Sequence, residues 1–328
     1  MRKSRRGSIK KIIIAALLAV TSLTAFSSCG QKRFSETYTD VFDTVTTFTA
    51  CCQNKNKFAE LSQTVHDELK RIDAIFSIYN EKSSAFAINT EKNAIICDDM
   101  YQVLLVSREF YDKTGGKLNI AMGSVLSLWH EFRENGRSLP EKEALMSASA
   151  HADMDNLHFT DVNAAISDPD MTLDFGAVAK GYAADAVSRL LDCDFILNIG
   201  GNVYAGGHKE GGSKWSVGVE NPDGGLLTVL AASDVSVVTS GDYQRYRELN
   251  GVRYHHIIDS ETLYPSVLYR SVTIIHTSSL IADALSTALF CMDIESGRAL
   301  ALEYGAEALW MKNDGTLVRT DGFANYEK

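Results

Sequence analysis

The chain has 328 residues, of which 45% are hydrophobic and 23% are charged, and its formal net charge is −10. This composition is that of a globular protein long enough for one large domain or two fused lobes. The acidic balance argues against nucleic acid as a partner and against a polybasic membrane patch, because phosphates and anionic lipids attract lysine and arginine.

The first 28 residues are predicted to be an export signal outside the fold. Six basic residues precede a short apolar segment, residues 12–23, which is too short and wrongly flanked for a stable transmembrane anchor. Ser27 and Ser28 then precede Cys29, which resembles the bacterial lipoprotein cleavage box, in which the cysteine is lipidated. We therefore expect an exported protein anchored by a lipid on Cys29 to the extracytoplasmic face of the bacterial membrane. Plain secretion is the alternative.

The rest of the chain is expected to be a short polar tether, residues 29–36, followed by one functional domain, residues 37–328. Removal of the signal would lower the net charge to −16, since it contains six basic residues and no acidic ones. The five later cysteines show no spacing typical of a zinc site or a disulfide framework. Cys51 and Cys52 are neighbours in a predicted strand, so they should point to opposite faces.

Helices and strands are predicted in an irregular order. The best-defined element is a helix over residues 57–77, where apolar residues recur at steps of three and four. The other predicted helices are residues 100–113, 141–150, 174–191, 279–290 and 295–304, and the predicted strands are residues 41–50, 195–199, 215–219, 253–258, 271–276, 308–312 and 316–319. Paired glycines between residues 200 and 225 predict short strands joined by tight turns. The mixture favours one compact α+β unit, with a division into two lobes left open.

The helix predicted over residues 279–290 carries a carboxylate and a hydroxyl on one face. Asp283 and Thr287 are four residues apart, so their side chains lie one turn apart. Their oxygens could bind Mg²⁺, which usually takes one or two protein carboxylates beside substrate phosphates. The alternative is local. Asp283 would favour the helix N-terminus, with Ser278 or Ser279 as the cap, and Thr287 would bond to the Asp283 carbonyl.

Residues 173–185 are predicted to form a strand end, a glycine turn and a helix start. Lys180 is placed where its ammonium could reach a phosphate at the helix N-terminus. The segment is not a Walker loop, and no G-x-G-x-x-G occurs in the chain, so a Rossmann dinucleotide site has no support. The alternative is a surface Lys180 and a capping Asp174.

Residues 239–243 and 254–259 add a third group of polar side chains. The pair His255 and His256 lies close to Asp259, which is compatible with a metal site or an acid–base group. The alternative is one histidine packed in a strand and one exposed to solvent.

In this order, these segments resemble the ApbE family of flavin transferases, whose members move FMN from FAD onto a protein. The resemblance runs from about residue 41 to residue 312. It is carried by an early helix ending in Phe-Ser-x-Tyr at residues 76–79, by Asp-x-Gly-x-x-Ala-Lys-Gly-Tyr at residues 174–182, by Asn198–Asn202, by Thr239–Tyr243 with His256–Asp259, and by Ala282–Thr287. Each motif alone is weak, but their common order is specific.

The resemblance implies Mg²⁺-dependent transfer of FMN from FAD to a serine or threonine hydroxyl of an acceptor flavoprotein, with release of AMP. Acceptors would be membrane redox-pump subunits or other exported flavoproteins. The implied Mg²⁺ ligands are the backbone carbonyl of Ala177 and the side chains of Asp283 and Thr287. Lys180 would add positive charge at the phosphates, and His256 is our candidate general base. FAD contacts are expected at Phe42, Tyr79, Lys117, Leu118, Asn119, Asp174, Lys180 and Ile258.

The sequence departs from the family pattern at three places. Residues 42–44 replace Met-Gly-Thr, residues 117–119 replace a small-aromatic-Asp triplet, and residues 260–263 lack the usual Pro and Thr-Gly. The first two departures fall where the family touches the ends of FAD. Two alternatives therefore stay open: an FAD diphosphatase that releases FMN and AMP, and a lipid-anchored FAD-binding protein without catalysis.

Overall fold

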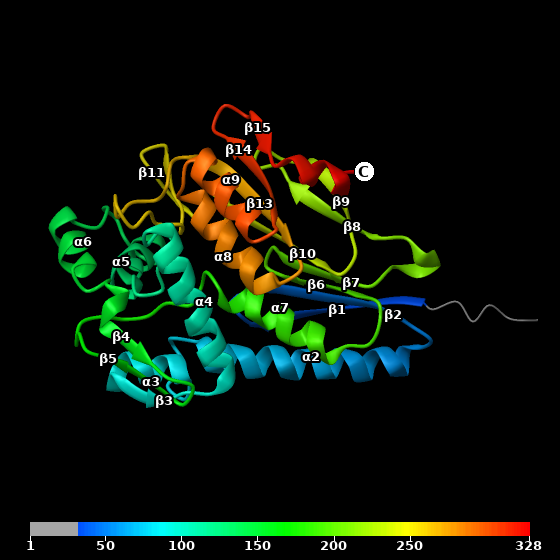
Figure 1. The fold of residues 1–328 in the computed structure, drawn as a ribbon, viewed down its shortest axis with the longest axis horizontal. Helices are drawn as coiled ribbons and strands as arrows, with labels where there is room; N and C mark the ends of the chain where they lie inside the picture. Colours follow the sequence, from blue (N-terminus) through cyan, green and yellow to red (C-terminus); the bar gives the residue numbers. More distant parts are fainter. Residues whose placement is uncertain (1–31) are drawn as a thin grey trace, which may run out of the picture.

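The computed structural model describes residues 32–328, whose arrangement is drawn in Figure 1. The predicted export signal and the lipidation site Cys29 lie outside the described residues. Within residues 32–328, no helix combines the length and apolar character needed to cross a membrane. Helices and antiparallel strands are mixed along the chain, which confirms the α+β class.

An eight-stranded antiparallel sheet forms the centre of the molecule, in the order β1-β2-β6-β7-β10-β13-β14-β15. Its strands are β1 (Lys32–Val41), β2 (Thr44–Cys52), β6 (Phe195–Ile199), β7 (Asn202–Gly206), β10 (Val235–Gly241), β13 (Tyr269–His276), β14 (Glu307–Lys312) and β15 (Leu317–Arg319). Residues 32–36, which we expected in the tether, instead form the first half of β1 and pair with β2. They are held there because Phe34 stacks on Phe58 with ring centroids 5.5 Å apart.

Three helices cover one face of this sheet: α2 (Lys55–Phe76), α7 (Ala179–Leu190) and α8 (Ser279–Phe290) (Figure 1). The other face is covered by the hairpin of β8 (Trp215–Glu220) and β9 (Leu226–Ala232). Cys52 belongs to the core under the helices, and Cys51 belongs to the core under the hairpin. The two cysteines therefore lie on opposite faces, as the strand pattern predicts.

The remaining elements flank these layers. They are α3 (Ser84–Glu91), α4 (Asp98–Thr114), α5 (Gly123–Glu134), α6 (Lys142–Ser149), α9 (Ile294–Glu303), β3 (Asn93–Ile95), β4 (Leu157–Phe159), β5 (Asn163–Ile166), β11 (Arg247–Leu249), β12 (Val252–Tyr254) and the 3₁₀ turns η1 (Met154–Asn156), η2 (Glu210–Gly212) and η3 (Asp321–Tyr326). Helices α5 and α6 share a separate apolar core with the β11–β12 hairpin, at the left of Figure 1.

Several element predictions need correction. The strand expected over residues 41–50 is divided by a turn at residues 42–43, so that Val41 ends β1 and β2 begins at Thr44. The strand expected over residues 253–258 ends at Tyr254, because the His255 ring takes over local hydrogen bonding: it donates to the Ser266 carbonyl and accepts from the Ile257 N–H. The helix expected from residue 174 begins only at Ala179, after a turn over residues 176–178. Helix α5 was not predicted, although its buried residues recur at helical spacing.

Candidate functional site

Helices α7 and α8 touch at Gly181. A Cβ atom there would lie 2.4 Å from the carbonyl oxygen of Ser279 and 2.7 Å from the Cβ of Asp283. Only glycine permits such an approach, so the first turn of α7 lies directly against α8. The Gly181 N–H donates a 2.9 Å hydrogen bond to Oδ2 of Asp283, which joins two motifs 102 residues apart in the sequence.

The carboxylate of Asp283 is buried beside a lysine. Only 4% of its side chain is exposed, and the Lys180 Nζ lies 3.8 Å from its Oδ2 while donating a 3.0 Å hydrogen bond to the Gly176 carbonyl. Burial raises the pKa of Asp283, whereas Lys180, Asn202 and the Gly181 N–H act to lower it. Positive charge beside this carboxylate therefore stabilises its ionised form.

The local interpretation of Asp283 as a helix-terminal residue is wrong. Helix α8 begins at Ser279 with Ser278 as its N-cap, so Asp283 lies beyond the first turn. The helix N-terminus is satisfied by Asp185 of α7, whose carboxylate accepts from the Ser278 hydroxyl at 2.6 Å and from the N–H groups of Ser279 and Leu280 at 2.6 and 3.0 Å. Asp185 thus fixes α7 against α8 and leaves Asp283 available.

Two further oxygens in these motifs have no hydrogen-bond partner within the described chain. In a regular helix the Gly181 N–H would donate to the Ala177 carbonyl four residues earlier, but here it donates to Asp283. The Thr287 hydroxyl also makes no hydrogen bond within residues 32–328, and the Asp283 carbonyl accepts instead from the Ser286 hydroxyl at 2.9 Å. A carbonyl, a carboxylate and a hydroxyl are oxygen donors of the kind that Mg²⁺ prefers, so these three residues fit the ion.

Asn202 is a buried site residue that sequence reasoning missed. It is 3% exposed, it acts to lower the Asp283 pKa, and its Nδ2 makes no hydrogen bond of good geometry within residues 32–328. Its position depends on the turn of Gly200 and Gly201, whose φ angles are 54° and 100°. A Cβ on Gly200 would lie 2.3 Å from Oγ1 of Thr44. The Gly-Gly motif was the available signal, because it fixes the start of β7.

The two histidines have separate roles. His255 is buried and bonded on both ring nitrogens, so it is structural. His256 is partly exposed, and its Nδ1 lies 3.2 Å from the carbonyl oxygen of Gln244. Because a carbonyl only accepts, Nδ1 carries the proton and Nε2 keeps the free lone pair. Burial lowers the pKa of His256 to about 3, helped by His255 and by the cations Arg133, Lys180 and Arg245. His256 is therefore neutral near pH 7.

Tyr79 and Asp174 are coupled electrostatically on one side of the site. The Tyr79 side chain is 72% exposed, and its ring lies 6.0 Å from the ring of His130 in α5. Partial burial raises the pKa of Tyr79, Asp174 raises it further and Arg133 opposes the change. The Asp174 carboxylate accepts from the Gly176 N–H at 2.8 Å, so it caps the turn rather than a helix.

Phe42 lies in the tight turn between β1 and β2. Phe42 and Asp43 have φ angles of 55° and 48°, which are strained for residues with side chains. Arg245 stabilises the turn by donating to the Asp43 carbonyl at 2.7 Å. Strained turns of this kind are frequent at functional sites.

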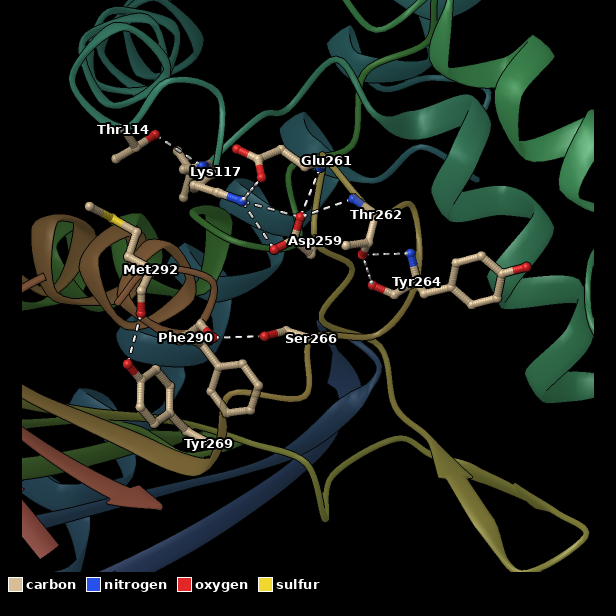
Figure 2. Close-up of polar contacts among 11 residues, drawn as sticks. Thr114, Lys117, Asp259, Glu261, Thr262, Tyr264, Ser266, Tyr269, Phe290 and Met292 are labelled. Carbon is tan, nitrogen blue, oxygen red and sulfur yellow. Dashed lines mark hydrogen bonds and ion pairs between the residues drawn. The ribbon is translucent and has the colours of Figure 1, made fainter. Parts of the chain in front are cut away.

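Lys117, expected to contact FAD, is engaged within the protein. Figure 2 shows its ammonium between Asp259 and Glu261, with Nζ 3.1 Å and 3.2 Å from the two Asp259 oxygens and 3.2 Å from Oε2 of Glu261. Burial lowers the pKa of Lys117, but the two carboxylates raise it more, and the net pKa is raised. The Asp259 carboxylate also accepts from the N–H groups of Glu261 and Thr262.

The neighbouring predicted contacts also have internal partners. Leu118 and Ile258 are 1% and 6% exposed, so their side chains face apolar cores. Asn119 accepts from the Ala121 N–H and donates to the Ala152 carbonyl, both at 2.8 Å. The chain thus brings Lys180 and Asp283 together on two packed helices, with Ala177 in the turn before α7 and Thr287 one turn after Asp283 on α8. Flavin contacts at residues 117–119 and 258 stay predictions.

Comparison with known proteins agrees with this arrangement. A profile of the ApbE family matches residues 42–310. The FAD:protein FMN transferase of Treponema pallidum is 32% identical over 78% of each chain, and that of Haemophilus influenzae is 29% identical over 95% of this chain and 94% of the relative. The crystal structure of the ApbE protein from Thermotoga maritima superposes with a TM-score of 0.82 at 28% identity, covering 90% of this chain and all of the other. Together with the joined Asp-x-Gly-x-x-Ala-Lys-Gly-Tyr and Ala-Asp-Ala-Leu-Ser-Thr motifs, these matches establish that the chain belongs to the ApbE family.

Proposed function

We propose that this chain transfers FMN from FAD to a serine or threonine hydroxyl of an acceptor protein and releases AMP. The observation that carries the proposal is the buried Asp283 carboxylate, bonded to Gly181, paired with Lys180 and followed one turn later by the Thr287 hydroxyl. Such a group of oxygens beside a lysine suits a phosphorylated substrate with its divalent cation.

Ala177, Asp283 and Thr287 would hold Mg²⁺ through a carbonyl, a carboxylate and a hydroxyl. When bound, the ion would neutralise the negative charge that develops on the diphosphate as the bond between its phosphates breaks. Lys180 would add a second positive charge beside Asp283. Asp174 and Tyr79 would hold the flavin part of FAD, by hydrogen bonding and ring packing.

His256 would accept the proton of the attacking hydroxyl at Nε2. The hydroxyl oxygen forms a bond to the phosphorus next to riboflavin, the bond from that phosphorus to the AMP oxygen breaks, and AMP leaves. The pKa of about 3 is low for a base, but its causes include three nearby cations. An anionic diphosphate near the same cations would raise that pKa, so binding of FAD would itself make His256 more basic.

The direct test incubates purified protein with FAD, Mg²⁺ and a candidate acceptor, and measures fluorescent covalent flavin and a mass gain of one FMN. Asp283→Ala should lower the rate by about 100-fold or more, because even changes to groups around metal ligands cost 10–100-fold. Asp314→Ala, an exposed carboxylate remote from the site, is the control and should be unaffected. Full activity of Asp283→Ala, or in EDTA, would refute the metal assignment. Free FMN without labelled protein would indicate a diphosphatase instead.

The N-terminal sequence further supports a lipid-anchored, exported enzyme. Cys29→Ala should move the protein from the membrane fraction to the soluble fraction, because a lipid on this cysteine is the proposed attachment. Fractionation with immunodetection measures this shift. An unchanged membrane fraction would rule out lipid on Cys29 as the anchor.

A further inference from the structure

Arg133, in the last turn of α5, is a cation without a carboxylate partner in the part of the chain that the structure describes. Its Nη1 is buried and makes no hydrogen bond within residues 32–328, and no carboxylate of that segment lies within ion-pair distance of its guanidinium. Burial lowers its pKa. An unpaired and partly buried cation destabilises a folded protein, so a group that pairs with it on binding would gain affinity from it.

Arg133 interacts electrostatically with two residues that are proposed to hold FAD. His130 lies three residues earlier on the same face of α5, and its ring contacts Tyr79 at 6.0 Å. Tyr79 and Asp174 both interact electrostatically with Arg133. The Arg133 charge is thus close enough to act on both groups, although the guanidinium forms no ion pair with Asp174 within residues 32–328.

Besides burial, three cations act together to lower the pKa of His256. Arg133, Lys180 and Arg245 each act on it, and His256 itself is neutral. Lys180 has a carboxylate neighbour in Asp283, and Arg245 is bonded to the β1–β2 turn. Arg133 has no comparable partner in the described chain. A concentration of positive charge in a chain of net charge −10 indicates a site for an anion.

Hydrogen bonds to neighbouring segments hold the end of α5, and with it the backbone of Arg133, in a fixed position. The Trp129 indole N–H donates to the Leu263 carbonyl at 2.8 Å, and Arg247 donates to the carbonyls of Arg133 and Glu134 at 2.9 and 3.3 Å. These contacts leave the guanidinium of Arg133 unused. A fixed position before the ligand arrives is what a binding residue needs.

We propose that Arg133 binds the diphosphate of the dinucleotide substrate through its guanidinium. The proposal rests on the proposed function, because FAD supplies the diphosphate. Arginine suits this role, since its planar fork can donate two parallel hydrogen bonds to one phosphate. Lys180 and Arg133 would then hold the phosphates from two separate helices, α7 and α5.

The test measures FAD binding in EDTA by titration calorimetry, so that neither metal nor turnover contributes. Arg133→Met should weaken FAD binding by about 10–100-fold, the usual effect of losing a hydrogen bond to a charged group. Arg133→Lys should recover part of the loss. Riboflavin, which has no phosphate, should bind all variants equally, and inorganic diphosphate should compete with FAD only when Arg133 is present. Arg137→Met, an exposed arginine four residues later, is the matched control.

The thermal midpoint of the ligand-free protein separates binding from a structural role. Arg133→Met should leave it unchanged or raise it, because the variant removes an unpaired buried cation. A lowered midpoint, wild-type affinity for FAD, or equal weakening of riboflavin would overturn the proposal. Loss of FAD affinity in a protein that never transfers FMN would support Arg133 while refuting the transferase function. If Arg133→Met transfers FMN and binds FAD with unchanged affinity, the transferase function would be supported and the role of Arg133 refuted.

Discussion

The carboxylate of Asp283 and the imidazole of His256 illustrate how burial sets the charge of single residues in this site. Burial raises the pKa of Asp283 and lowers that of His256, so burial alone favours the neutral form of each. Lys180 opposes the effect on Asp283 and reinforces the effect on His256. One lysine thus favours the ionised form of a candidate metal ligand and the neutral form of a candidate base, while the net pKa of Asp283 stays raised.

His256 should make the protein less stable as the pH falls. In the unfolded chain a histidine binds a proton near pH 6.5, whereas the folded His256 does so only at about pH 3. Between these values the unfolded state holds one more proton, so the free energy of unfolding falls by about 1.4 kcal/mol per pH unit from this residue. When the free energy of unfolding is measured with urea between pH 6.5 and 4.5, it should fall less steeply with decreasing pH in His256→Gln than in the wild type. His158→Gln replaces an exposed histidine and should keep the pH dependence of the wild type. The same pH dependence in the wild type and both variants would contradict the assignment.

At the scale of elements, the site depends on two helices packed without a side chain between them. Gly181 allows the contact, and Asp185 fixes it by satisfying the N-terminus of α8. The separation between the backbones of Lys180 and Asp283 is therefore set by the packing of the two helices, which varies less than the conformation of the long lysine side chain.

Gly181→Ala should separate α7 from α8. The added methyl would lie 2.4 Å from a backbone oxygen, which cannot give way without movement of a helix. We expect a loss of about 1–3 kcal/mol in the free energy of unfolding and a larger relative loss of FMN transfer. Gly297→Ala on α9 is the control, since its nearest neighbours are side-chain atoms at 3.2 and 3.3 Å. Normal activity of Gly181→Ala would show that the close contact is not needed.

At the scale of the whole molecule, the candidate site residues come from separate parts of the fold: Lys180 and Asp283 from the packed helices α7 and α8, and Arg133 from α5. Three contacts connect residues 117–134 to the segment between β10 and β13: the ion pair of Lys117 with Asp259, the hydrogen bond from Trp129 to Leu263, and the hydrogen bond from Arg247 to the end of α5. They fix His256, which lies within the same segment, relative to Arg133.

The Lys117–Asp259 pair should be a major part of this connection. Asp259→Ala leaves a mostly buried ammonium without its main partner and should lower the free energy of unfolding by about 3–5 kcal/mol. Lys117→Met added to that variant should restore part of the loss. Glu60→Ala breaks an exposed pair with Lys57 and should change stability by at most about 1 kcal/mol. Chemical denaturation measures all three, and equal effects of Asp259→Ala and Glu60→Ala would contradict the structural role.

The sequence by itself determined the features that depend on near neighbours along the chain. Helical periodicity predicts the row of buried apolar residues on α2 and the shared face of Asp283 and Thr287. Glycine conformation predicts the end of α4 at Gly115. The order of motifs was enough to identify the family. The side chains of Lys117, Leu118 and Ile258 could not be placed from spacing, because their partners are distant in sequence.

Only the tertiary structure decided which residues complete the site. Asp185 and Arg133 gave no local signal of a role, and the local alternative for Asp283 was excluded only once the structure fixed the start of α8 and its contacts with α7. The physical reason is that burial and unpaired charge belong to the assembled fold. A residue's charge state and free hydrogen-bonding atoms are set by whatever the rest of the chain brings against it.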